Sequence, residues 1–566
     1  MTDSRRRIEH VVVLMLENRS FDHMLGFLDH PDQSFPRLRA GEHPNRRNPA
    51  DPGSPATGVS ADATYTLAVD PPHSHKSAME QLNLRIGRRA RMDGFVAAYV
   101  RKASGNDERP VIHWWRLGVL GLAVVATATS ASRRFVGGSR PTWLVVRAAL
   151  AGALTWRLVQ AKRRIDDPPA NEVATEVGAD VMRCMAPERI PVLATLAKEF
   201  AVCTNWHCSV PGETWPNRNF LHAATSERTV DIELGFYDSP TIFDTLEEHG
   251  ASWRVYHDGR AHLWAFRNLW RGSRIGRWEP TSTFEEHVAG GDLAAYSFIE
   301  PDHQGGDSNS QHPGNNGPEK AGVDFVRAEE LIAHVYDVLR RHPQAFEKTL
   351  LVITYDEHGG LFDHVPPPHP VPAPPPLKRE RLSLAMLSRR FVAFFIERRS
   401  PRFGFRLLGP RVPTVIISPL IPVGTIDHQV HDHTSVVSTL RSLFAPGAQP
   451  LTARDEWAAT FDHLASLGEP RRGADMPEVA APPRSTAPSP AAVRPMVPGL
   501  SAPDEFSHQL DQLGDLVSSE LEPRGVAGSG APAGSASPAG RSEQGDEAVR
   551  RFRNAAAEAR QSGGHG

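Results

Sequence analysis

Cysteine is scarce in this chain, with 3 residues among 566. Cys203 and Cys208 lie five positions apart, and Cys184 precedes them. Three cysteines are too few for a disulfide framework or a zinc knuckle, so we expect buried free thiols, although the spacing also admits one disulfide pair. The cysteine content therefore leaves the cellular compartment open.

A strong charge of either sign is also absent. The chain has 63 Lys and Arg residues against 66 Asp and Glu residues, a formal net charge of -3. This balance gives no electrostatic case for binding nucleic acid. With 40% hydrophobic and 23% charged residues, a chain of this length can bury a large core and exceed one domain. The composition predicts a large globular enzyme.

Hydrophobic runs long enough to span a bilayer are missing from the region of about 100–180. Residues 117–132 carry no charge, but they fall short of the roughly 18 to 20 residues that a spanning helix needs. A second apolar stretch at 141–164 contains Arg147 and Arg157. With tryptophans and arginines at their borders, the two stretches predict a helical hairpin. Residues 114–164 would either meet a membrane surface or form a buried hairpin or dimer contact.

A signal peptide is not apparent at the N-terminus. The arginines at 5–7 precede only six apolar residues, 11–16, before Glu17, and we interpret that run as the first core strand. We therefore expect a protein that is cytoplasmic or peripheral to the membrane, or exported if a leader was removed.

Two buried strands that end in oxygen donors are the first features with chemical content. Residues 11–16 predict a strand buried on both faces, and Glu17 and Asn18 follow it directly. Residues 350–355 repeat the design and run into Asp356 and Glu357. Ligands bind at the carboxyl ends of strands in open α/β sheets, so these side chains favour a divalent cation. Calcium, magnesium, manganese and zinc all accept such donors.

The remaining strand signals predict the fold class. A third apolar strand at 411–422 passes through Ser418 and supports several parallel strands with helices between them. We therefore predict an α/β protein with a doubly wound, mostly parallel sheet flanked by helices.

Thr214 stands between the two oxygen-donor strands, in a string bracketed by Gly212 and Pro216. A threonine hydroxyl is a poor nucleophile unless a base or a metal lowers its pKa. Asn217 and Arg218 follow at once, and their amide and guanidinium suit a phosphate oxygen or the bracing of a site. A turn with a helix-capping threonine would produce the same string.

These motifs resemble those of a known family. The ordered strings are ENRSFDHMLG, PPHSH with MDGFV downstream, PGETWPNR, the HP of NSQHP, YDEHGGLFDHVPPP and HDHTSVVSTL. They are similar to the motifs of the bacterial and plant phosphoesterase family, which contains non-specific phospholipases C and a group of acid phosphatases. The resemblance covers roughly residues 8–445 apart from the insertion. It implies a core like that of the alkaline phosphatase superfamily, with a metal-assisted phosphoryl transfer site.

The resemblance also implies roles for individual residues. Five residues would hold the metal: Glu17, Asn18, Thr214, Asp356 and Glu357. Three would contact the substrate phosphate: Asn18, Asn217 and Arg218. Thr214 would be the covalent nucleophile, and His75 and His312 would act as general acid or as charge stabilisers. Asp363 and His364 would orient the metal ligands from behind.

Two positions depart from the family pattern. Ser310 stands where relatives commonly carry an acidic residue before the His-Pro pair, so a charge that could tune His312 is missing. Glu213 precedes Thr214 where many relatives have a neutral residue. If the Glu213 carboxylate pointed inward, it would repel an anionic substrate.

Three functions are compatible with these observations. The first is a phospholipase C that releases diacylglycerol and a phosphorylated head group from glycerophospholipids. The second is a phosphomonoesterase of the acid phosphatase type that uses the same site. The third is a membrane-associated scaffold with little or no activity, for which Ser310 and Glu213 are the support. Head-group preference and oligomeric state are not indicated by the sequence.

The domain organisation follows from composition. Residues 1–470 are predicted to form the catalytic domain, and 471–566 a largely disordered tail rich in Pro, Ala, Gly and Ser. Within this tail, helices are expected at 502–521 and 546–561. The proline-rich residues 366–376 predict an extended surface loop, and 377–399 an amphipathic helix at the surface or at a membrane.

Overall fold

The computed structural model describes most of the chain. The described residues are 7–67, 69–84, 89–104, 111–112, 177–304, 308–313, 323–375, 396–397, 403–482, 505–521 and 538–563. The chain divides into two compact units, and the first comprises Met1–Tyr99, Val177–Leu377 and Gly404–Gly566. The predicted hairpin and the membrane-facing region 114–164 lie outside the described residues.

The second unit comprises Val100–Glu176 and Lys378–Phe403. Its described part contains β4 (Val111–Ile112), which pairs antiparallel with β11 (Ile396–Glu397). Most of the amphipathic helix predicted at 377–399 lies outside the described residues, and the two described positions within it belong to a strand.

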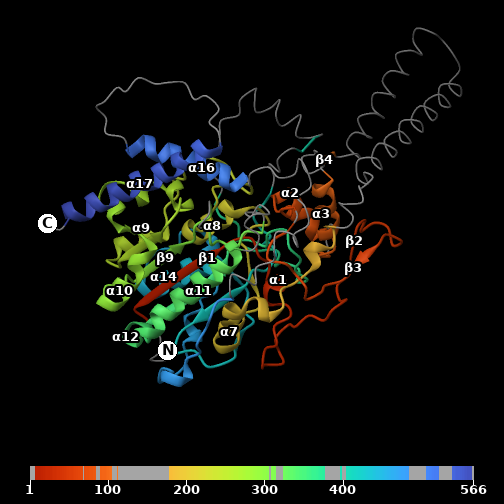
Figure 1. Cartoon of the computed structure of the whole chain (residues 1–566), viewed down its shortest axis with the longest axis horizontal. Coiled ribbons are helices and arrows are strands. Elements are labelled where there is room, and N and C mark those ends of the chain that lie inside the picture. Colours follow the sequence, from red (N-terminus) through yellow and green to blue (C-terminus); the bar gives the residue numbers. More distant parts are fainter. Residues whose placement is uncertain are drawn as a thin grey trace, which may run out of the picture. The chain divides into compact units, whose positions relative to one another are not determined.

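An eight-stranded sheet lies at the centre of the first unit, with the order β13-β5-β12-β10-β1-β9-β7-β8 (Figure 1). Its strands are β1 (His10–Leu16), β5 (Ala201–Cys203), β7 (Trp253–His257), β8 (Trp278–Glu279), β9 (Tyr296–Glu300), β10 (Thr349–Tyr355), β12 (Thr414–Ile417) and β13 (Thr425–Asp427). Because β12 pairs antiparallel with both β10 and β5, it runs against the others, whose pairs are all parallel. The predicted mostly parallel sheet is confirmed, but the third predicted strand is antiparallel to its neighbours.

The register of the central strands sets the position of the site. β1 lies between β10 and β9, and Leu16 is opposite Tyr355. The residues that follow these two strands therefore leave the sheet side by side. Every residue of β9 and β10 is buried, which requires cover on both faces of the sheet.

Helices provide that cover. The described helices before the C-terminal tail are α1 (Phe21–Leu25), α2 (His75–Leu82), α3 (Phe95–Ala103), α7 (Pro191–Glu199), α8 (Thr214–Ala223), α9 (Ile242–Glu248), α10 (Phe284–Gly290), α11 (Val323–Arg341), α12 (Pro343–Phe346), α14 (Thr434–Phe444) and α15 (Ala453–Trp457). α14 contacts α8, α9 and α15, whereas α11 contacts α7, α10 and α12. Two short strand pairs lie outside the main sheet: β2 (Asn45–Arg46) with β3 (Ala56–Thr57), and β6 (Trp206–His207) with β14 (His431–Asp432).

The C-terminal tail contains two helices that dock on the first unit. They are α16 (Glu505–Leu521) and α17 (Pro538–Gly563), at the places where helices were expected (Figure 1). Phe552 of α17 is fully buried and lies 4.8 Å from the ring of Trp264 and 5.1 Å from that of Trp278. The helices expected within the tail are therefore present, and Phe552 anchors the second of them. Most of the tail residues predicted to be disordered lie outside the described part of the chain.

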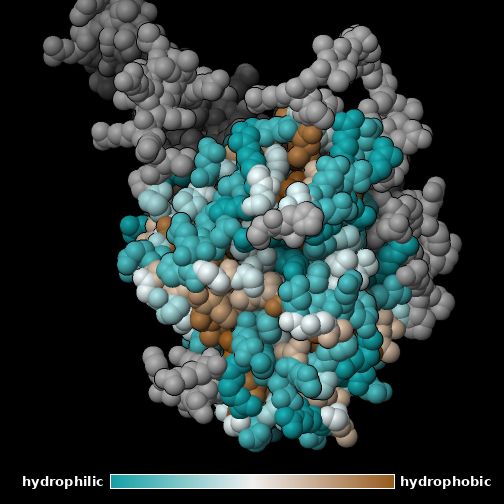
Figure 2. Space-filling view, turned by 90° about the vertical axis from the view of Figure 1, so that its left-hand side faces the viewer, coloured by the Kyte–Doolittle hydropathy of each residue, from teal (hydrophilic) through white to brown (hydrophobic). Residues whose placement is uncertain are grey.

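The surface and the cysteines complete the description. Among the described residues, no helix has the length and apolar character needed to cross a bilayer. The face in Figure 2 is largely hydrophilic, with smaller apolar areas between the polar ones. All three cysteines are buried and free, as expected, and burial raises the pKa of each thiol.

Candidate active site

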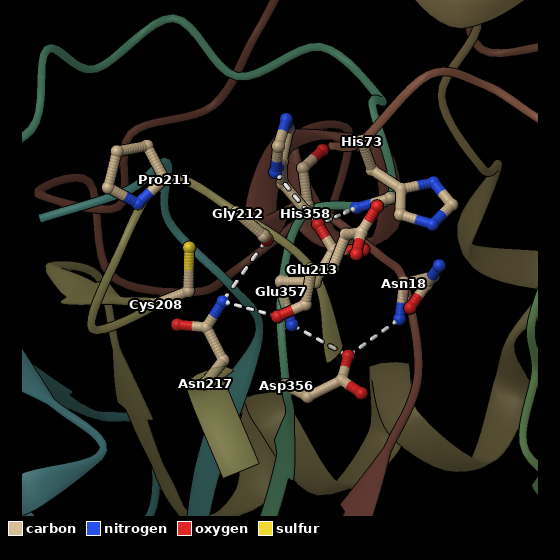
Figure 3. Close-up of polar contacts among 12 residues, drawn as sticks. Asn18, His73, Cys208, Pro211, Gly212, Glu213, Asn217, Asp356, Glu357 and His358 are labelled. Atoms are coloured by element: carbon tan, nitrogen blue, oxygen red, sulfur yellow. Dashed lines mark hydrogen bonds and ion pairs between the residues drawn. The ribbon is translucent and has the colours of Figure 1, made fainter. Parts of the chain in front are cut away.

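The two predicted oxygen-donor motifs meet at the ends of β1 and β10. Glu17, Asn18, Asp356 and Glu357 are all fully buried. Asp356 Oδ1 accepts the backbone N–H groups of Asn18 at 3.0 Å and of Glu357 at 2.7 Å (Figure 3). One carboxylate oxygen therefore joins the two strand ends, which lie 338 positions apart in the chain.

Thr214 lies beside these strand ends. It is the first residue of α8, and its hydroxyl donates to Asn18 Oδ1 at 3.3 Å. A helix N-terminus carries partial positive charge and unpaired N–H groups, so it favours a bound anion. The structure thus brings the predicted nucleophile to the predicted ligands, at a position suited to a phosphoryl group.

Asn217 supports the loop before Thr214. Its Oδ1 accepts the N–H of Val210 at 3.0 Å, and its Nδ2 donates to the carbonyls of Gly212 at 3.2 Å and Glu213 at 3.1 Å (Figure 3). The amide is occupied by backbone groups of its own loop. This arrangement differs from the predicted phosphate contact and gives Asn217 a positioning role.

Arg218 braces the strand ends instead of facing a substrate. It is fully buried, and its Nε donates to Asp356 Oδ2 at 3.1 Å. Its Nη1 donates to Glu300 Oε1 at 2.8 Å and its Nη2 to the carbonyl of Met15 at 3.1 Å. The described contacts of Arg218 are therefore with the protein and differ from the predicted phosphate contact. They agree with the alternative prediction that Arg218 braces the site.

A buried Glu17–His303–Glu300 chain lies next to Asp356, and sequence reasoning missed it. His303 Nδ1 lies 3.0 Å from Glu17 Oε2, and His303 Nε2 lies 2.6 Å from Glu300 Oε1. Burial opposes ionisation of Glu17, but His303 outweighs it and lowers the Glu17 pKa to about 2. Burial likewise opposes protonation of His303, but Glu17 raises the His303 pKa to about 9. The missed signal was Glu300, the last residue of the buried strand β9.

The PPHSH motif contributes His73 to the site in place of His75. The charge of His73 acts on Glu357, and Figure 3 shows the two side by side. His73, Asp70 and His312 each offer one atom within 4.8 Å of the others. His75 instead is the first residue of α2, with its Nδ1 2.5 Å from the carbonyl oxygen of Pro211. The sequence alone did not distinguish His73 from His75. In the structure Ser74 caps α2, so His73 belongs to the loop before the helix and His75 to the helix itself.

His358 supports Glu357 from behind. Its Nδ1 lies 3.0 Å from Glu357 Oε2, and its Nε2 lies 2.7 Å from Gln81 Oε1. Burial lowers the pKa of His358 to about 3, so the ring is neutral at physiological pH. The sequence prediction assigned this supporting role to Asp363 and His364.

Asp363 and His364 belong to a different cluster. Asp363 Oδ1 accepts from Arg411 Nε at 3.0 Å, and His364 Nδ1 lies 2.7 Å from Asp22 Oδ2. Their described hydrogen bonds secure the start of α1 and not the metal ligands. The prediction was wrong because Gly359 and Gly360 turn the chain away after Glu357, with φ angles of 63° and 69°.

The two departures from the family pattern have structural partners. Glu213 Oε2 accepts the backbone N–H of Ile232 at 2.5 Å, so this carboxylate is held by the chain behind the loop. Ser310 Oγ accepts the backbone N–H of His312 at 3.4 Å. The contact of Glu213 with Ile232 gives no sign that the Glu213 carboxylate would repel an anionic substrate.

The donor set fits a divalent cation. Among the described residues, Glu17 Oε1 and Glu357 Oε1 are buried carboxylate oxygens that have no hydrogen-bond partner, a costly state that a cation would relieve. Burial also raises the pKa of Asp356, against the opposing charge of Arg218, and that of Glu357 to about 8. A bound cation would favour the ionised form of both carboxylates, so the site is suited to a cation.

Comparisons with known proteins agree with this geometry. A model of the Phosphoesterase family matches residues 8–445. Non-specific phospholipase C6 of Arabidopsis thaliana is 30% identical over 533 residues, covering 91% of this chain and 81% of that protein. Non-specific phospholipase C1 of the same plant is 29% identical over 489 residues, covering 83% and 73%. Non-hemolytic phospholipase C of Burkholderia pseudomallei is 28% identical over 310 residues, covering 47% and 42%.

Solved structures give more distant matches. A protein in the alkaline phosphatase superfamily from Vibrio parahaemolyticus aligns with a TM-score of 0.26 and 13% identity, covering 47% of this chain and 63% of that one. The sequence relationship is more extensive, since the family model spans all the motifs from the first strand to α14. The chain therefore belongs to the Phosphoesterase family and is a phosphoric ester hydrolase.

Proposed function

We propose that this hydrolase is a phospholipase C that cleaves glycerophospholipids into diacylglycerol and a phosphorylated head group. The observation that carries the proposal is the Thr214 hydroxyl, which lies at the start of α8 and 3.3 Å from Asn18 Oδ1. The two plant relatives and the bacterial relative are all named phospholipases C, which supports a phosphodiester as the substrate.

The reaction proceeds in two displacements at phosphorus. Thr214 Oγ1 releases its proton to solvent as it attacks in line and forms a bond to phosphorus, while the bond from phosphorus to the glycerol oxygen breaks. His312 donates a proton to this oxygen, and diacylglycerol leaves. The phosphothreonine that remains still carries the head group. Water then attacks the phosphorus, and Thr214 recovers its hydroxyl as the phosphorylated head group departs.

A divalent cation held by Glu17, Asn18, Thr214, Asp356 and Glu357 would lower the pKa of the attacking hydroxyl and neutralise phosphoryl oxygens. The chain's own contribution is to hold these oxygen donors still. Arg218 fixes Asp356, His303 keeps Glu17 ionised, and His358 sets the orientation of Glu357. His73 lies beside Glu357 and would contact a phosphoryl oxygen. Calcium, magnesium, manganese and zinc all suit these donors.

The substrate also bears on where the protein acts. A phospholipid is presented at a membrane surface, so the enzyme must meet that surface during turnover. Residues 114–164, which were predicted to make such a contact, lie outside the described part of the chain. A cytoplasmic or membrane-peripheral location therefore stays a prediction.

Diacylglycerol release from phosphatidylcholine vesicles tests the proposal with three forms of the enzyme. We expect the wild type to release diacylglycerol, Thr214→Ser to retain part of the rate because a hydroxyl remains, and Thr214→Ala to lose at least about a thousandfold. A Thr214→Ala enzyme as active as the wild type would refute the nucleophile. A wild type that cleaves soluble phosphate monoesters but no phospholipid would support the phosphomonoesterase instead.

A further inference from the structure

Asp324 is a buried carboxylate near the start of α11 that has no role in the site described above. It is 1% exposed, and its Oδ1 accepts the backbone N–H of Ser310 at 2.9 Å. Its Oδ2 has no hydrogen-bond partner among the described residues. A buried carboxylate oxygen without a partner is destabilising, so a neutral residue would be more stable here unless the charge is used.

The hydrogen bond from Ser310 places Asp324 behind the loop that carries His312. This loop, residues 308–313, contains Gln311 in a left-handed conformation with φ of 70°, which is strained for a residue other than glycine. Such a conformation persists only when neighbouring groups hold it. The Ser310 carbonyl accepts the N–H of Glu17 at 2.9 Å, and the Gln311 carbonyl accepts from Arg19 Nε at 2.8 Å. Asp324 secures the same residue, Ser310, through its backbone N–H.

The charge of Asp324 also acts on the site. Burial raises the pKa of Asp324 to about 7, and Glu17 contributes to the rise, while the Ser310 N–H and His312 oppose it. The interaction with His312 is attractive. Ser310 occupies the position where the family resemblance led us to expect a carboxylate beside His312, and the Asp324 carboxylate reaches that position from 14 residues further along the chain.

We propose that Asp324 is a positioning residue for His312, and that it supplies from α11 the carboxylate that position 310 lacks. The proposal rests on the role given to His312 in the proposed function. Asp324 acts on the geometry and charge of the loop and touches no substrate. Its removal should therefore lower kcat more than it changes KM.

Four variants test this role in the full-length enzyme. Asp324→Ala removes the acceptor and the charge, while Asp324→Asn keeps the size and an acceptor oxygen. Ser310→Asp combined with Asp324→Ala moves the carboxylate to the loop. Glu329→Gln is the matched control, because Glu329 is another buried carboxylate of α11 whose Oε2 accepts a backbone N–H, that of Val192, at 2.9 Å and whose Oε1 has no partner among the described residues.

Steady-state kinetics on phosphatidylcholine, with thermal unfolding of each variant, gives the answer. We expect Asp324→Ala to lower kcat about 30-fold with KM changed less than about threefold, and the double variant to recover to within about fivefold of the wild type. Glu329→Gln should keep wild-type kcat. If Asp324→Ala does not fold, Asp324→Asn should still lower kcat about tenfold.

The proposal is overturned if both Asp324 variants keep kcat within about twofold of the wild type, or if the folded double variant is no more active than Asp324→Ala. This failure is distinct from failure of the proposed function. In the first case Thr214→Ala remains inactive while the Asp324 variants work normally. In the second, Thr214→Ala itself retains activity.

Discussion

At the scale of single residues, the carboxyl groups of the site differ in pKa because they have different neighbours. His303 lowers the pKa of Glu17 to about 2, whereas burial raises the pKa of Glu357 to about 8. Glu17 is thus charged throughout the physiological range, and Glu357 is not. Protons and cations compete for Glu357 but hardly for Glu17.

This competition predicts that cation affinity depends on pH. Below about pH 8 the Glu357 carboxyl is protonated in the cation-free protein, so a cation must displace that proton. We expect the affinity for manganese to rise by up to about tenfold per pH unit between pH 6 and 8 and then to level off. Calorimetry in buffers of different ionisation enthalpy would measure the released proton. An affinity independent of pH over this range would contradict the assignment.

The two histidines of the PPHSH motif form a matched pair for mutation. His73 lies beside Glu357, whereas the side chain of His75 supports the Pro211 carbonyl. We expect His73→Ala to lower kcat about a hundredfold with little effect on unfolding. His75→Ala should lower the unfolding temperature and affect kcat far less. The reverse outcome, with His75 the more important for turnover, would restore the sequence prediction.

At the scale of elements, local patterns predicted the chemistry better than the connections between strands. Glu17, Asn18, Asp356 and Glu357 were found because each pair follows an uninterrupted apolar strand, and Thr214 because its loop has a distinctive composition. The reversed direction of β12 was missed because strand direction depends on pairing partners far along the chain. His303 was missed for the same reason, since it acquires its role only when β9 lies against β1.

Gly359 is the point where the turn after β10 touches the end of β1. It has φ of 63°, and an added Cβ would lie 2.1 Å from the carbonyl oxygen of Asn18. Gly250 has a similar φ of 76° but open space around it, so Gly250→Ala reports the backbone strain alone. We expect Gly250→Ala to lose about 1 kcal/mol of stability, and Gly359→Ala to lose more because its Cβ also meets the backbone of Asn18. Only Gly359→Ala should also lose cation binding, measured by calorimetry. Equal cation binding in the two variants would contradict this close approach.

At the scale of the whole molecule, the two helices of the tail were predicted from the sequence, but their docking on the first unit was not. Helices were expected at 502–521 and 546–561, and a few residues of α16 and α17 secure them to the first unit. Glu520 pairs with Arg267 at 2.5 Å, and Arg553 pairs with Asp258 at 3.2 Å. Average composition is insensitive to a single buried anchor such as Phe552. The insertion predicted at about 100–180 stays a prediction, because its hairpin lies outside the described residues.

Phe552 should account for much of the stability of the docked tail. Truncating a buried phenylalanine to alanine typically costs about 3–5 kcal/mol, and this ring packs against Trp264 and Trp278. We expect Phe552→Ala to increase hydrogen exchange across α17 while the exchange of β1 and β10 stays slow. Phe552→Leu, which keeps most of the apolar volume, should lie in between. Unchanged protection of α17 in the alanine variant would show that the ion pairs hold it instead.

The central claim is that Thr214 attacks a phospholipid diester, and the most direct measurement is the mass of the adduct on that residue. Enzyme mixed with phosphatidylcholine vesicles is quenched in acid within one turnover, digested and analysed by mass spectrometry. A phospholipase C leaves a phosphocholine group on Thr214, together with free diacylglycerol, and Thr214→Ala gives neither. Diacylglycerol formed with no adduct on Thr214, or an adduct formed only from phosphate monoesters, would contradict the account.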